Sequence, residues 1–245
     1  MNRFLLCLFF AFSFCFEGKL PLNIENKVYS NINSIIGIMV EFQYEEEDDP
    51  NTTGNGHFIL NQIDDVQGRC NGFIVDPPPH NKAYFESQLL SVSNYFENVS
   101  NGLQIFNNIT VLDEVYELSN PMSFYSQTDS NLTNAFKDAL FLAKDDLIEF
   151  DNLDNSIIVV FHAGIGQDFA VPLLDPTPYD LSSAYIDSDM LSGWDSFTEL
   201  GFNVGHGIIL PETQNHIFYN VIEELFWAET DYCDYQIGLA GIFSL

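Results

Sequence analysis

The sequence predicts a mixed α/β fold in one domain, and three observations indicate it. Apolar strand-like runs alternate along the chain with amphipathic helical segments. Residues 157–161 are five consecutive apolar β-formers, the pattern of a strand buried on both faces. The 245 residues are 46% hydrophobic and 15% aromatic, which supports a sizeable core. We therefore expect an α/β (α+β) domain in which two or more helices pack on a mixed sheet.

The first elements lie before a run of three prolines at residues 77–79. Residues 35–42 form an apolar run typical of a strand, and the charged stretch 45–50 that follows it predicts an exposed loop. Residues 56–60 are a candidate for a second short strand. The prolines then interrupt any regular element.

A helix is expected after the prolines. Asn81 is suited to cap it, and the apolar residues that follow at spacings of four and three share one face; they are Phe85, Leu89, Val92, Phe96 and Val99. Gly102 stands where the end of a helix favours a left-handed residue. Residues 103–118 alternate as a strand does.

The second half of the chain predicts a second helix and further strands. The helix covers about residues 131–150, with an apolar stripe of Leu132, Phe136, Leu140, Ala143 and Leu147. Short strands are expected at 184–186 and 207–210. Residues 218–227 indicate a helix, and residues 237–245 indicate the start of another.

The N-terminus predicts export to the periplasm or outside the cell. Residues 1–16 have the features of a signal peptide, because Arg3 precedes an apolar run too short to span a bilayer. Ser13 and Cys15 are small enough to be the −3 and −1 positions of a signal-peptidase site. The alternative is a lipoprotein acylated at Cys15, which the preceding Phe14 disfavours. We expect an N-terminal extension at 17–34 and the main domain at 35–245.

The charge excludes two classes of partner. Seven Lys and Arg stand against 36 Asp and Glu, for a formal net charge of −29. Nucleic acid and an anionic membrane surface are excluded, because too few cations are present to neutralise phosphates. The acidity fits either cation binding or solubility in a salty environment, and the second interpretation is the simpler one.

Two cysteines, Cys70 and Cys233, remain after the signal peptide. In an exported protein they are candidates for a disulfide, although their spacing alone does not establish it.

The most distinctive local segment follows the buried strand. His162, Gly164, Gly166 and Asp168 form a candidate functional loop at the place where α/β folds bind ligands. The alternative is a tight turn with a hydrogen-bonded histidine. The segment matches neither a P-loop nor a dinucleotide fingerprint.

Carboxylates offer two further candidate sites. Asp151 and Asp154 are a weak candidate for calcium, since their loop lacks the glycine and final glutamate of an EF-hand; a solvated turn is the favoured interpretation. The carboxylate pairs could serve glycoside hydrolysis, but such pairs arise readily in so acidic a chain. They are Asp187 with Asp189, Glu223 with Glu224, and Asp231 with Asp234.

The histidines argue against a catalytic zinc site within this sequence. The five are His57, His80, His162, His206 and His216, and none lies three or four residues from another. H-E-x-x-H is therefore absent, and so is the G-x-S-x-G of serine hydrolases.

Two segments resemble one protease family. Residues 91–102 (SVSNYFENVSNG) are similar to the "S-V-x-x-Y-Y-x-x-x-S-x-G" segment of immune-inhibitor-A-type secreted metalloproteases, and residues 162–166 (HAGIG) match their "H-A-G-x-G". The resemblance covers about residues 35–169. Residues 151–155 (DNLDN) correspond to the family's Asp-rich "D-x-D-x-D-G" turn but lack its D-G. This difference weakens the expectation that calcium binds there.

The resemblance implies a zincin-like fold and, for the complete family enzyme, a catalytic zinc. Residues 238–243 resemble the turns that lead into the family's zinc helix, and the sequence given ends about where the first zinc histidine is expected. No zinc ligand or catalytic glutamate matches in this chain, so none is carried over. The resemblance predicts the N-terminal part of a secreted zinc metalloendopeptidase, acting on protein or peptide and inactive as this chain. The alternative is a non-catalytic exported module that binds peptide, glycan or calcium.

Overall fold

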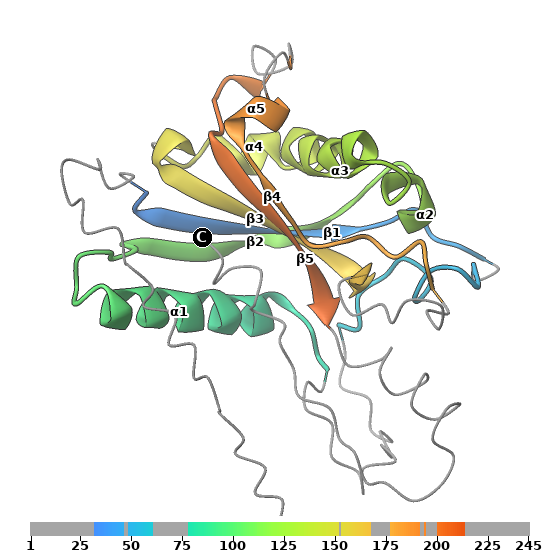
Figure 1. Ribbon diagram of the computed structural model, residues 1–245, viewed down its shortest axis with the longest axis horizontal. Coiled ribbons are helices and arrows are strands. Elements are labelled where there is room, and N and C mark those ends of the chain that lie inside the picture. The colour runs from blue at the N-terminus through green and yellow to red at the C-terminus, as the bar shows by residue number, and fades with distance from the viewer. Residues whose placement is uncertain are drawn as a thin grey trace, which may run out of the picture. The chain divides into compact units, whose positions relative to one another are not determined.

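The computed structural model describes residues 32–46, 49–60, 78–151, 153–167, 177–191, 194 and 200–213. They form a five-stranded sheet in the order β2-β1-β3-β5-β4 (Figure 1). Four strands are parallel and the edge strand β4 is antiparallel to β5. The strands are β1 (Ser34–Glu41), β2 (Asn108–Glu117), β3 (Ser156–Ile165), β4 (Ala184–Ile186) and β5 (His206–Thr213). The predicted mixed α/β fold is confirmed.

Helices cover both faces of the sheet. The long helix α1 (Lys82–Val99) lies on one side, and the other helices lie on the opposite side in Figure 1. These are α2 (Met122–Tyr125), α3 (Asp129–Leu142), α4 (Lys144–Leu147) and α5 (Ser188–Leu191). A single 3-10 turn, η1 (Leu153–Asn155), precedes β3.

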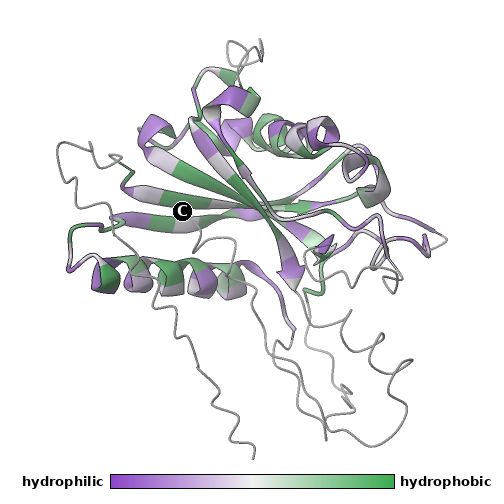
Figure 2. Ribbon diagram, in the orientation of Figure 1, coloured by the Kyte–Doolittle hydropathy of each residue, from purple (hydrophilic) through white to green (hydrophobic). Residues whose placement is uncertain are grey.

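The central strands β1 and β3 are apolar, as expected of strands that are covered on both faces (Figure 2). Along β1, Ile36 and Ile38 pack in the cluster that contains α3, whereas Ile35 and Met39 pack in the cluster that contains α1. β3 is buried along nearly its whole length. The prediction that residues 157–161 form a doubly buried strand is confirmed.

Helix α1 begins at the cap that the sequence indicated and ends in a turn that contains the indicated glycine. The side chain of Asn81 accepts a hydrogen bond from the backbone N–H of Tyr84, as a capping residue does. At the other end Gly102 has a positive φ of 77°, but Asn101 before it is also left-handed, with φ 54°. The Gly102 N–H bonds to the carbonyl of Glu97, which closes the helix with a Schellman-type turn.

Two predictions about element boundaries and one about a buried residue are wrong. The helix expected over residues 131–150 is broken at Ala143, where ψ is 5°; α3 and α4 form instead, with Ala143 and Leu147 both fully buried. The strand expected from residue 103 begins only at Asn108. Val99 was expected on the buried face of α1 but is 56% exposed, so the apolar contact ends before the helix does.

Several predictions lie outside the described residues. They concern the signal peptide and most of the extension, the helices at 218–227 and 237–245, and residues Cys70, Asp168 and Cys233. Within the described ranges, no helix has the length and apolar character needed to cross a membrane.

Candidate functional site at the carboxyl end of the sheet

The connections of the sheet diverge at the carboxyl ends of β1 and β3. From β1 the chain passes through α1 to β2 on one side, whereas from β3 it passes to β4 and β5 on the other. In parallel sheets a ligand binds where the strand order reverses in this way, outside the carboxyl ends of the strands. This edge of the sheet is therefore the first place to examine for function.

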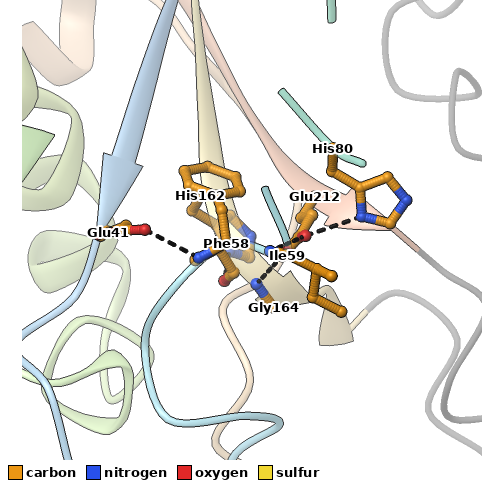
Figure 3. A network of polar contacts seen from close by, with 8 residues as sticks. Glu41, Phe58, Ile59, His80, His162, Gly164 and Glu212 are labelled. Carbon is orange, nitrogen blue, oxygen red and sulfur yellow. Dashed lines mark hydrogen bonds and ion pairs between the residues drawn. The ribbon is translucent and has the colours of Figure 1, made fainter. Parts of the chain in front are cut away.

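Neighbouring strands place polar groups at this edge (Figure 3). Glu41 is the last residue of β1, and Glu212 is the last but one residue of β5. His162 and Gly164 come from β3, which lies between β1 and β5 in the sheet. Val40 pairs with His162, and His162 pairs with Pro211, so the parallel register brings these groups to one level.

Glu212 is the centre of a buried hydrogen-bond network. Its Oε1 accepts the backbone N–H of Ile59 at 2.8 Å and lies 2.8 Å from Nδ1 of His80. Its Oε2 accepts the backbone N–H of Gly164 at 3.0 Å. The residue is only 3% exposed, and such a buried carboxylate is tolerated because donors occupy both of its oxygens.

His80 joins the start of α1 to this network. It is 2% exposed, and its ring lies 4.7 Å from the ring of Tyr84. Its backbone N–H donates to the carbonyl of Ile59 at 2.8 Å. A carboxylate only accepts hydrogen bonds, so the contact with Glu212 requires a proton on Nδ1 of His80.

The predicted loop residues have structural roles in the part that is described. Gly164 has φ 84°, and a Cβ there would lie 2.8 Å from both the Thr53 carbonyl oxygen and the Met122 Cε. His162 is 1% exposed; its Nδ1 lies 2.9 Å from the carbonyl oxygen of Ala163, and its ring meets Phe42 edge-on. Gly166 forms an isolated bridge with Leu181. This geometry favours the tight-turn interpretation of the segment.

The candidate strand at residues 56–60 is not a strand. Its backbone N–H groups bond to side chains instead of a neighbouring strand: Phe58 donates to Glu41 Oε1 at 3.0 Å, and Ile59 donates to Glu212. The second oxygen of Glu41 lies 4.0 Å from Nδ1 of His57. The prediction fails because carboxylates from distant strands take the donors that a sheet would have used.

Sequence reasoning missed Glu41, His80 and Glu212 as members of one site. The available signal was their position, since both glutamates end apolar strand runs. His80 gave no signal, because it follows the prolines and has no ligand partner nearby in the sequence.

Of the remaining carboxylate candidates, Asp151, Asp154, Asp187 and Asp189 are described, whereas Glu223, Glu224, Asp231 and Asp234 lie outside the described residues. Asp151 and Asp154 are both exposed, and calcium binding there stays a prediction. Asp187 accepts the backbone N–H of Met190 at 2.9 Å, where it caps α5. In the described part of the chain, no group of three or more His, Cys, Asp or Glu is arranged to hold a metal ion.

Comparisons with protein-family models, with curated proteins and with solved structures found no match to this chain.

Proposed function

We propose that this chain forms the sheet-bearing, N-terminal part of a secreted zinc metalloendopeptidase of the immune-inhibitor-A type, and that it does not hydrolyse peptides by itself. The observation that carries the proposal is the position of the H-A-G-x-G segment. Its His162 and Gly164 lie at the carboxyl end of a central parallel strand, and Gly164 is bound there by Glu212 from the next strand. This is the edge at which a sheet of this kind supports a ligand.

The arrangement of the other resembling segments supports the same proposal. Residues 91–102 form the second half of α1 and the turn that closes it. The segments that follow in the resemblance become β2, the α3–α4 region and β3, in that order. The result is a mixed sheet with packed helices, which is the architecture that the resemblance implies.

Zinc chemistry is not assigned to any residue of this chain. In the complete family enzymes a zinc-bound water attacks the peptide carbonyl, and the glutamate of H-E-x-x-H acts as the base. His80 and His162 do not fit such a site: His80 is bound to Glu212, and Nδ1 of His162 lies against the carbonyl oxygen of Ala163, its neighbour in β3. The contribution of this chain is the scaffold, in which Glu212 joins β5 to Gly164 of β3 and to His80 before α1 at the carboxyl edge.

Two measurements test the proposal. Sequencing the transcript across the codon of Leu245 should show an H-E-x-x-H in the same reading frame, and the joined product should clear casein in a zymogram. A zinc chelator, or replacement of the motif's glutamate by glutamine, should abolish that clearing. The 245-residue chain should give none. Clearing by the 245-residue chain that a zinc chelator abolishes, or a transcript without the motif, would overturn the proposal.

A non-catalytic exported binding module is the second candidate. The absence of H-E-x-x-H from all 245 residues favours it. It predicts that the chain folds stably and as a monomer without any additional segment. Calorimetry and sedimentation of the purified 245-residue protein would distinguish the two candidates, together with the transcript sequence.

A further inference from the structure

Residues 56–60, which we call the strap, cross the carboxyl edge of the sheet. Phe58 is bound to Glu41 at the end of β1, and Ile59 is bound to Glu212 near the end of β5. Because β3 lies between those two strands, the strap passes the end of β3, where Gly164 also bonds to Glu212 (Figure 3). The strap therefore occupies the place where a parallel sheet would meet a ligand.

Few side-chain contacts fasten the strap. Phe58 is its one large buried side chain and meets the ring of Phe85 edge-on at 5.6 Å. His57, Ile59 and Leu60 are each more than one third exposed. Segments with few buried apolar contacts belong to the least stable parts of a fold and open locally before the core does.

The hydrogen bonds of the strap are of a kind that water can replace. Its N–H groups donate to the carboxylates of Glu41 and Glu212, and both carboxylates would regain hydration if the strap moved away. Two backbone bonds complete the closed state, from Phe42 N–H to the Gly56 carbonyl and from His80 N–H to the Ile59 carbonyl.

Two glycines lie where the chain enters the strap: Gly54 just before it and Gly56 as its first residue. Gly54 and Gly56 have φ values of 77° and 95°. Nothing lies within 4 Å of where a Cβ of Gly54 would be, so glycine is needed there for its backbone conformation and not for space. Such residues commonly act as hinges because they absorb large changes in φ and ψ.

We propose that the strap is a cover that opens as a unit about Gly54 and Gly56 while the sheet stays folded. When closed, it binds Oε1 of Glu41 and Oε1 of Glu212, and its Ile59 carbonyl accepts the backbone N–H of the buried His80. When open, it exposes the carboxyl edge to a ligand. This inference goes beyond the proposed function and does not depend on zinc or on peptide hydrolysis.

Hydrogen exchange of the full 245-residue chain tests the opening directly. The amides of Phe58 and Ile59 should exchange at least ~100-fold faster than those of Val159 and Val160 in β3, yet more slowly than free peptide. Equal rates in the strap and in β3 would show that the strap opens only with global unfolding. Rates equal to those of free peptide would show that it is not closed. Either result overturns the proposal.

A matched pair of variants tests what holds the strap shut. Phe58→Ala should accelerate exchange in the strap at least ~10-fold, because it removes the buried anchor, and β3 should still exchange more slowly than the strap. Leu60→Ala removes a partly exposed side chain of the same segment and should change neither rate. If Phe58→Ala leaves exchange in the strap unchanged, this side chain does not hold the strap shut, which contradicts the proposal.

Chemical modification of His80 tests access to the edge. Carbethoxylation of this residue, followed by mass spectrometry, should be faster in Phe58→Ala than in the unaltered chain and unchanged in Leu60→Ala. If His80 reacts at one rate in all three proteins, the strap does not control access and the proposal fails.

Discussion

At the scale of single residues, Glu212 links several segments of the chain through its hydrogen bonds. One carboxylate binds donors from three segments: Ile59 in the strap, His80 before α1, and Gly164 after the main part of β3. Two of these segments, the strap and the turn before α1, lie outside the sheet, whereas β3 is already paired with β5 along its length. Loss of the carboxylate would leave these donors buried without an acceptor, which costs more than the hydrogen bonds themselves.

Replacing Glu212 by alanine should lower the free energy of unfolding by about 3–5 kcal/mol, because it removes the acceptor for the His80 ring and leaves the buried N–H groups of Ile59 and Gly164 unpaired. Glu212→Gln keeps one acceptor oxygen and should lose less. Urea denaturation measures both changes. The control is Glu114→Gln on the exposed side of β2, which should shift stability by less than about 0.5 kcal/mol. If Glu212→Ala behaves like this control, the network does not stabilise the fold.

Tyr125 is a buried residue whose ionisation should affect stability. Its ring is fully buried, and its hydroxyl donates to Asp138 at 2.8 Å. Burial is the main cause that raises the pKa of Tyr125 to about 12, and the hydrogen bond to Asp138 adds to it. In the unfolded chain the pKa of this tyrosine returns to about 10.

Stability should therefore fall as the pH rises from about 10 to 12, since the unfolded chain loses the Tyr125 proton first and the native state retains it. Below pH 10 both states keep the proton and the effect is absent. Urea midpoints between these pH values should decline less steeply in Tyr125→Phe than in the unaltered chain. The pKa of Tyr116 is also raised, mainly by burial, so part of the decline should remain. Identical slopes in the two proteins would contradict the assignment.

At the scale of elements, one close approach explains how α3 sits on the sheet. A Cβ added to Gly207 of β5 would overlap the ring of Phe136 from α3. Phe136 is fully buried, so the ring has no free space into which it could move. The glycine allows helix and strand to approach more closely than two side chains would permit.

Gly207→Ala should therefore cost about 1–3 kcal/mol through overpacking, measured by thermal or urea unfolding. The matched control is Gly205→Ala two residues earlier, where a Cβ would meet nothing within 4 Å. That variant should be neutral or slightly more stable. Combining Gly207→Ala with Phe136→Leu should cost less than the sum of the two single changes. A cost for Gly207→Ala no larger than that of the control would show that the layers are not packed this tightly.

The edge strand β2 shows how an element can be protected from association. Between Gly37 and Met39 the register moves from Val111 to Val115, so β2 bulges against β1. The bulge contains Asp113 and Glu114, both exposed. Charges and a bulge at a sheet edge oppose pairing with another chain.

At the scale of the whole molecule, charge is the dominant property. A net charge of −29 makes the folded chain repel itself, because compaction brings carboxylates together with few cations between them. Lys82 is a cation that offsets part of this repulsion, because its ammonium group contacts both Glu86 and Asp113.

Raising NaCl from 10 to 150 mM should stabilise the protein by about 1 kcal/mol, or ~2–4 °C in melting temperature, because the screening length shrinks from ~30 to ~8 Å. The comparison at pH 4.1, the sequence isoelectric point, should show little salt effect. A melting temperature that falls with salt at pH 7 would mean that attractive pairs outweigh the repulsion.

Local patterns in the sequence were sufficient for much of the fold. The run 157–161 predicts a doubly buried strand, and Asn81 predicts the start of α1, because both signals depend on neighbours within a few residues. The break at Ala143 could not be predicted, since no proline or glycine marks it. It arises from packing on the sheet, where Ala143 and Leu147 are both buried.

By itself, then, the sequence determined the fold class, most of the elements and the acidic surface, because periodicity, capping and composition act locally or as sums over the chain. Only the tertiary structure decided the site. Glu212 is 132 residues from His80 and 153 from Ile59 in the sequence. Their hydrogen bonds exist because the strand order places β1, β3 and β5 side by side, and no local pattern encodes that order.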